Sequence, residues 1–182
     1  MWIEDYSGKI SQGTIVDGIP WKDGEDQPLG IVLSNACDLE HNHSSFIIVA
    51  ALVSAKDVLT GTNNFKNKLQ DNKITQKNAQ KFFKPYINNE SIVRYYFIGD
   101  YIEAGIDDYL MVDFQQIQSF DISSIESLDP LAQLRHPFIE QMMMRYTAYT
   151  SRIPSDRVSE EELQKIVNYL ADDFLPKDAL LR

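Results

Sequence analysis

The sequence of 182 residues contains a single cysteine, Cys37. One cysteine excludes an intramolecular disulfide and is typical of proteins from a reducing compartment. Residues 1–20 lack the basic and apolar regions of a secretory leader, and no apolar run approaches the ~20 residues that span a bilayer. Hydrophobic residues still make up 43% of the chain, which is sufficient for a packed core. We therefore expect a folded cytoplasmic protein without a membrane segment.

Positive charge is also scarce, because 17 Lys and Arg residues face 27 Asp and Glu residues, for a net charge of −10. An acidic surface repels nucleic-acid phosphates, so general nucleic-acid binding is disfavoured. Residues 56–84 are the exception, with seven Lys, two Asp and a net charge of +5. Such a segment is either a solvated helix face or a contact for an anionic partner. Any nucleic-acid contact is expected only there.

Several motifs that carry chemistry are missing from the sequence. There is no glycine-rich phosphate loop, no dinucleotide-binding fingerprint and no HExxH zinc motif. Adjacent acidic pairs such as Asp107-Asp108 diverge on a strand, so they are more typical of solvated turns than of an acid–base pair. The sequence thus predicts no cofactor and no bound metal.

Short runs of β-branched and aromatic residues, separated by turn residues, predict strands. The predicted strands are Thr14–Val16, Ile31–Ser34, Ser45–Val53, Ser91–Ile98, Tyr109–Phe114 and Ile117–Ile122. The run over 45–53 is apolar throughout, which predicts burial on both faces. Five or six short strands joined by turns favour a small barrel or sandwich over alternating βαβ units.

Helical patterns interrupt and follow these strands. A helical turn is predicted at Ala55–Leu59, and a weakly amphipathic helix or insertion over 65–83, ended by Pro85. Asp129 before Pro130 predicts a helix N-terminus, and His136-Pro137 predicts another. From there a stripe at helical spacing predicts a helix, and Ser159 opens a capping box for a last one. The stripe consists of Phe138, Met142, Tyr146, Tyr149 and Ile153.

We therefore predict an α+β protein. Residues 1–125 form the β-barrel domain, with an insertion near residues 60–88, and residues 126–182 form C-terminal helices packed on the barrel.

The densest group of chemically capable side chains is the polar loop that follows the second predicted strand. Three interpretations remain open for it. In the first, Cys37 is a nucleophile with His41 or His43 as its base and Asp38 as the group that orients that base. In the second, Cys37 and the two histidines bind zinc. In the third, Cys37 is a small buried residue, Asp38 caps a turn and the histidines are exposed.

Two arginines of the predicted C-terminal helix form a second candidate site. Arg145 and Arg152 lie seven residues apart, so they project from the same side of the helix. Arginine offers a bidentate fork to a phosphate or carboxylate, and structural ion pairs with the acidic body are the alternative.

Two segments resemble a group of uncharacterised bacterial and phage proteins. The segment "GIVLSNACDLEH" (Gly30–His41) is similar to the "VxLSxxCDL" core of that group, and "LRHPFIEQMMMRYTAYTSRI" (Leu134–Ile153) is similar to its C-terminal helix. The positions that recur in the group are Cys37, Asp38, Arg145 and Arg152. The group has no assigned activity, and proteins of this type resemble accessory components of defence or mobile-element systems.

A more distant resemblance is to the MazF/PemK toxins. The segments "ISQGTIV" (Ile10–Val16) and "QPLGIVLSN" (Gln27–Asn35) look like two of their strands. The resemblance implies an SH3-like barrel and an endoribonuclease that uses an Arg with a Ser or Thr. Ser34 matches the small hydroxyl, Gln27 occupies the position of the Arg, and Arg94 is the candidate substitute cation.

The sequence hypotheses are thus three. The first is a non-enzymatic binding or adaptor component of a bacterial or phage multi-protein system, with a protein partner and with Arg145, Arg152 and His41 as candidate binding residues. The second is a hydrolase or transferase that depends on Cys37, with Asp38 and Ser34 as further candidate catalytic residues. The third is a MazF-like endoribonuclease.

Overall fold

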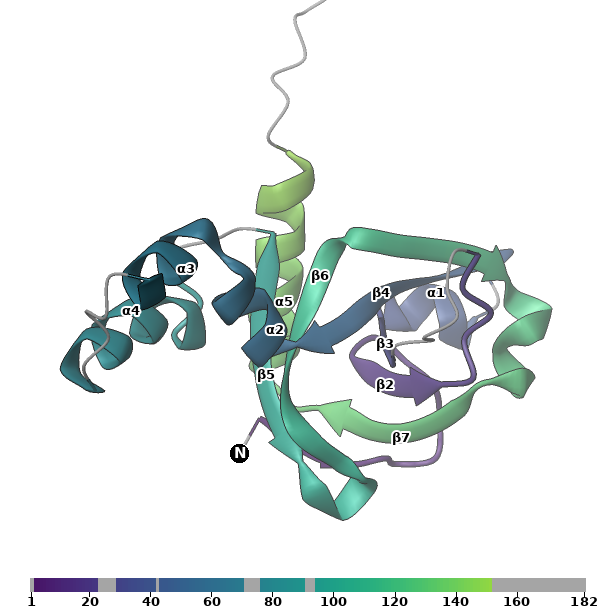
Figure 1. Ribbon diagram of the computed structural model, residues 1–182. Coiled ribbons are helices and arrows are strands. Elements are labelled where there is room, and N and C mark those ends of the chain that lie inside the picture. Colours follow the sequence, from purple (N-terminus) through teal and green to yellow (C-terminus); the bar gives the residue numbers. More distant parts are fainter. Residues whose placement is uncertain (1, 23–28, 42, 71–75, 91–93, 152–182) are drawn as a thin grey trace, which may run out of the picture. The chain divides into compact units, whose positions relative to one another are not determined.

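One seven-stranded sheet forms the centre of the computed structural model of this chain (Figure 1). The structure describes residues 2–22, 29–41, 43–70, 76–90 and 94–151. The chain divides into two units, residues 1–150 and 151–182, and the sheet and the described helices lie in the first unit. Every strand pairing among the described residues is antiparallel.

The strands are β1 (Ile3–Asp5), β2 (Thr14–Asp17), β3 (Gly30–Val32), β4 (Phe46–Ser54), β5 (Tyr95–Tyr101), β6 (Ile106–Asp121) and β7 (Asp129–Leu134). Their order across the sheet is β1-β7-β2-β3-β4-β6-β5. The two end strands meet, because the Tyr101 hydroxyl of β5 donates a hydrogen bond of 2.5 Å to the Asp5 carboxylate of β1. The sheet is therefore a nearly closed barrel, and the α+β class expected from the sequence is confirmed at this level.

Strand β4 confirms the expectation that its apolar run is buried on both faces. Ala50 and Leu52 pack into the main core, and Ile47 and Val49 pack into a second core on the other face. Successive side chains of a strand point to opposite faces, so a run that serves two cores has no polar alternation.

Strand β6 replaces two of the predicted strands. The pairing of β4 with β6 shifts between Ala50, which faces Ile117, and Ala51, which faces Asp113. Three extra residues therefore bulge out of β6 at this point, and a bulge bends a strand without ending it. The bulged residues interrupt the run of apolar residues in the sequence, which is why the single strand β6 was predicted as two strands, Tyr109–Phe114 and Ile117–Ile122.

A buried ion pair lies at the bulge. Arg94 Nε donates to Asp113 Oδ1 at 2.8 Å, and Arg94 Nη2 donates to Asp113 Oδ2 at 2.6 Å. The Asp113 side chain is only 4% exposed, against 38% for Arg94. Asp113 Oδ1 also accepts the Gln115 N–H at 2.9 Å, and the Phe114 N–H donates to the Arg94 carbonyl at 3.0 Å. One carboxylate therefore holds the bulge and ties the start of β5 to it.

The prediction that Asp129 and Pro130 begin a helix is wrong, because both residues belong to strand β7. Pro130 pairs with Val16 on one side, while β1 pairs only with residues 132–134 on the other. The proline, which has no N–H to donate, therefore lies where one edge of β7 is unpaired. The barrel thus continues past the predicted boundary at residue 125.

The helices are α1 (Ala36–Glu40), α2 (Ala55–Gly61), α3 (Asn63–Gln70), α4 (Gln76–Ile87) and α5 (Phe138–Thr150), with short 3-10 helices η1 (Ile102–Ala104) and η2 (Ile122–Ser127). Within the described residues, no helix combines the length and apolarity needed to cross a bilayer.

Helix α5 confirms the predicted apolar stripe. Met142 is fully buried, and Phe138, Tyr146 and Tyr149 pack around it on the main core. Phe114 of β6 contacts two of these rings, with centroid distances of 5.5 Å to Tyr146 and 6.2 Å to Tyr149. The predicted continuation through Ile153 and the capping box at Ser159 lie outside the described residues.

Helices α2, α3 and α4 form the predicted insertion, which we call the helical insert, and Figure 1 shows them gathered beside the β5–β6 end of the sheet. The prediction that Pro85 ends its helix is wrong, because α4 continues to Ile87. Pro85 lies in the last turn, where its missing N–H affects a single carbonyl, that of Lys81.

Replacing Asp113 by Ala is expected to lower the free energy of unfolding by about 3 kcal/mol, measured by urea denaturation. The substitution removes the partner of Arg94 and the acceptor that closes the bulge. The partial exposure of Arg94 places the effect at the low end of the range for broken buried pairs. Glu126→Ala, at an exposed position on η2, is the control and should change stability by less than about 0.5 kcal/mol. Equal stability of the two variants would show that the pair does not hold the bulge.

Replacing Tyr101 by Phe is expected to make the stability of the protein fall less steeply as the pH rises above ~10. The hydrogen bond to Asp5, together with burial, raises the pKa of Tyr101 to about 12, whereas an unfolded tyrosine titrates near 10. The protonated phenol is thus favoured by folding, so its contribution is complete below pH ~10 and is lost between pH ~10 and ~12. The melting temperature of the wild type should fall more steeply over that interval than that of Tyr101→Phe. Tyr109→Phe, which keeps the bond to Asp5, should follow the wild type.

Candidate functional site

The polar loop that contains the candidate catalytic residues folds into the short helix α1. Its N-cap is Asn35, whose side-chain oxygen accepts the Cys37 N–H at 2.8 Å. The helix closes when the His41 N–H donates to the Cys37 carbonyl at 3.1 Å. Asparagine is a favoured N-cap, so the residues that suggested a loop in fact begin a helix.

Ser34 has a structural role at the end of β3. Its side chain is buried, and its hydroxyl accepts the Ile48 N–H of β4 at 2.8 Å. Arg94, the cation that a MazF-like site would need beside Ser34, forms its two side-chain hydrogen bonds with Asp113. Gln27, the other position of that comparison, lies outside the described residues.

Cys37, Asp38 and His41 lie together on α1 and its C-terminal end, and all three are exposed. The suggestion that Cys37 is a buried packing residue is therefore wrong. Within the described part of the chain, the Cys37 sulfur forms no hydrogen bond to a base. The Asp38 carbonyl accepts the His43 N–H at 2.9 Å, and the rings of His41 and His43 lie 5.6 Å apart.

No three His, Cys, Asp or Glu side chains among the described residues are arranged to hold a metal ion. Of the two candidate arginines, Arg152 lies outside the described residues. Arg145 lines a hollow of about 340 Å³ with Tyr96 and Asn89. Burial raises the pKa of Tyr96 to about 12, while the positive charge of Arg145 acts in the opposite direction.

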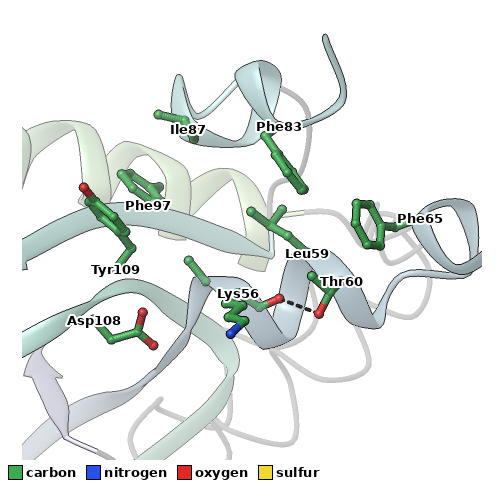
Figure 2. Close-up of a pocket in the computed structure, with 10 residues that line it drawn as sticks. Lys56, Leu59, Thr60, Phe65, Phe83, Ile87, Phe97, Asp108 and Tyr109 are labelled. Atoms are coloured by element: carbon green, nitrogen blue, oxygen red, sulfur yellow. Dashed lines mark hydrogen bonds between the residues drawn. The ribbon is translucent and has the colours of Figure 1, made fainter. Parts of the chain in front are cut away.

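A second cavity, of about 760 Å³, lies between the helical insert and strands β5 and β6 (Figure 2). We call it the apolar groove. It is lined by Ala55, Lys56, Leu59, Thr60, Phe65, Phe83, Ile87, Phe97, Asp108 and Tyr109. Its volume is within the range of ligand sites, which are concave and mostly apolar with a few polar groups.

Helix α2 provides the floor of the apolar groove. Ser54 caps it by accepting the Asp57 N–H at 3.4 Å. Ala55 and Leu59, four residues apart on one face, are both buried and pack with Phe97 of β5 and Met111 of β6. The capped helix follows β4 directly, so the sheet fixes where this floor lies.

Asn89 fixes α4 against the edge strand β5. Its side-chain amide donates to the Phe97 carbonyl at 3.1 Å, and its side-chain oxygen accepts the Phe97 N–H at 2.7 Å. Asn89 has a φ of 57° after the last turn of the helix, a left-handed conformation that asparagine tolerates. The amide thus replaces a strand partner and positions the neighbouring Ile87 at the groove.

Aromatic rings form two walls of the apolar groove. In the helical insert, the Phe65 and Phe83 rings stack with centroids 5.5 Å apart. On the sheet, the rings of Phe97 and Tyr109 stack at 6.0 Å, and Trp2 supports Phe97 edge-on at 5.4 Å. Such pairs add stability beyond their buried area, so both walls are preorganised.

The polar groups of the groove lie at its rim. The Thr60 hydroxyl already has a hydrogen-bond acceptor within α2, since it donates to the Lys56 carbonyl at 2.8 Å. Lys56 and Asp108 are exposed and, in Figure 2, lie on the side opposite Phe83 and Ile87. Most of the lining is aliphatic or aromatic, so the groove is suited to burying apolar groups.

Sequence reasoning missed this site because its walls come from distant segments. The sequence pattern predicts only that Phe97 and Tyr109 belong to strands and that Asp108 belongs to a turn. The Lys-rich segment over residues 56–84 was the available signal, and it contains five of the ten lining residues.

Cys37 is expected to react completely with iodoacetamide in the native protein, at a rate within about threefold of that in urea. Its exposure on α1 leaves the sulfur open to a small reagent. EDTA is expected to leave the rate unchanged, and Cys37→Ala should abolish labelling. Inertness until unfolding would show that the thiol is covered, and protection that EDTA removes would show a metal ligand.

No protein-family model matches the chain, and no curated protein matches it. Its likeness to the "VxLSxxCDL" group and to the MazF/PemK toxins rests on the quoted segments alone.

Proposed function

We propose that this protein is a non-enzymatic binding component of a multi-protein system, and that the apolar groove holds an apolar segment of a protein partner. The observation that carries the proposal is the concave aromatic and aliphatic lining of a cavity of about 760 Å³. Burying apolar area contributes roughly 25 cal/mol per Å², so a filled groove supplies a substantial driving force for association.

The exposed apolar side chains of the groove support a partner site. Tyr109 of β6 is 56% exposed and Ile87 of α4 is 40% exposed, and both line the cavity. Aromatic side chains are enriched at the centres of protein interfaces, where a few anchors supply most of the binding energy.

The architecture also fits a binding role. A nearly closed barrel is a rigid scaffold, and an insert packed on its edge is a typical place for recognition. We propose that the barrel is SH3-like, of the type found in the MazF/PemK toxins. The antiparallel order of short strands and the resemblance of segments 10–16 and 27–35 support this assignment.

Ile87→Glu is expected to abolish binding of the partner. Native protein, immobilised and exposed to a lysate of cells that carry the gene, should retain a protein that Ile87→Glu does not. Binding of the partner would bury the introduced carboxylate without a counter-charge, which is costly. In the unbound protein the side chain at position 87 is 40% exposed, so the carboxylate stays in contact with water and the fold remains intact.

Ile102→Glu is the matched control, because Ile102 is an equally large side chain that is 69% exposed on η1 and does not line the groove. The retained protein is then purified and titrated by calorimetry. Equal affinity for Ile87→Glu and Ile102→Glu would refute the groove as the binding site.

A further inference from the structure

The charge of the chain is divided between the helical insert and the rest. Residues 56–84 carry +5 and the remainder carries −15. This positive segment supplies α2, α3 and most of α4, which are the elements that form the floor and one wall of the apolar groove. The helices that form the floor and one wall of the apolar groove therefore belong to the most basic segment of an acidic protein, and Lys56 of this segment lines the groove.

The described lysines of the insert face solvent. Lys56, Lys66, Lys81 and Lys84 are all exposed. Within the described part of the chain none of the four forms an ion pair, whereas Lys9 pairs with Glu40 at 3.5 Å elsewhere. These four charges are therefore not neutralised by direct ion pairs, although Lys56 shares the groove with Asp108, and they are available to a partner.

Concavity distinguishes among anionic partners. A membrane surface favours apolar side chains that protrude from a helix face, but Leu59, Phe83 and Phe97 line a cavity. Nucleic acid is bound mainly through its phosphates along a basic groove, and this groove is apolar inside with charge only around it. A peptide that combines apolar anchors with flanking carboxylates matches both features.

We infer that the apolar groove binds an acidic amphipathic peptide segment, whose apolar side chains enter the cavity while its Asp and Glu residues face the lysines of the helical insert. This inference rests on the proposed function and specifies its partner. Apolar anchors at helical spacing would fill a groove of this kind, and the lysines would add specificity and a faster encounter with acidic segments.

The test is selection from a random 12-residue peptide library on the full-length native protein, with Ile87→Glu as counter-selection. Peptides that bind the native protein and not the variant report on the groove. They are expected to contain two or more large apolar residues and to carry a net negative charge, because their carboxylates would face the lysines of the helical insert.

Three results would overturn the inference. Groove-dependent peptides that are neutral or basic would leave the groove as a partner site and refute its preference for acidic segments. An absence of any groove-dependent peptide would refute the proposed function together with the inference. Ile87-dependent binding to phosphatidylglycerol vesicles or to a 12-nucleotide oligothymidine, without acidic peptides, would assign the groove to a lipid surface or to nucleic acid.

A charge reversal tests the lysines directly. For an enriched peptide, Lys56→Glu/Lys84→Glu is expected to weaken binding about tenfold at low salt, because Lys56 lines the groove and Lys84 lies one helical turn before the lining residue Ile87. Raising the salt to 0.5 M should remove most of that difference. Lys9→Glu/Lys22→Glu reverses two exposed lysines outside the insert and should change the affinity less than twofold. Equal weakening by both pairs would show that only overall charge acts, and would overturn the role of the insert.

Discussion

The ion pair between Arg94 and Asp113 is the contact on which the arrangement of the sheet depends. A carboxylate that is 4% exposed is costly to bury unless it is paired and hydrogen-bonded. Here it is bonded to the guanidinium and to the backbone of the β6 bulge. The bulge lets β6 pair with the whole length of β4, while the first half of β6 also pairs with β5. The sheet wall of the apolar groove is formed by these paired halves.

The groove is a consequence of how the insert is attached to that sheet. Helix α2 continues from β4, and Asn89 binds the backbone of the edge strand β5, so both ends of the insert are fixed to the barrel. An unpaired edge strand is open to association with other chains, and the asparagine side chain satisfies part of this edge. The space left between the two attachments is lined by aromatic and aliphatic side chains, with Lys56 and Asp108 among its lining residues.

Several residues of the segment Gly30–His41 hold the strands and helix around it in place. A Cβ atom at Gly30 would overlap Ile19 and Val49, so glycine is needed for close packing of β3. Ser34 bonds to β4, and Asn35 caps α1. These three roles, of Gly30, Ser34 and Asn35, are structural. Cys37 remains exposed on the surface of this segment.

The sequence by itself determined the local elements. The continuous apolar run predicted β4, because a strand buried on both faces has no polar positions. Helical spacing predicted the buried face of α5, because a helix buried on one face repeats its apolar residues at a fixed period. Only the tertiary structure decided that Asp129 and Pro130 join a strand, since pairing with β2 outweighed a local capping preference. It alone brought Leu59, Phe83 and Tyr109 to one cavity. Residues that meet across 50 positions leave no local period, so a groove built by packing cannot be read from a single sequence.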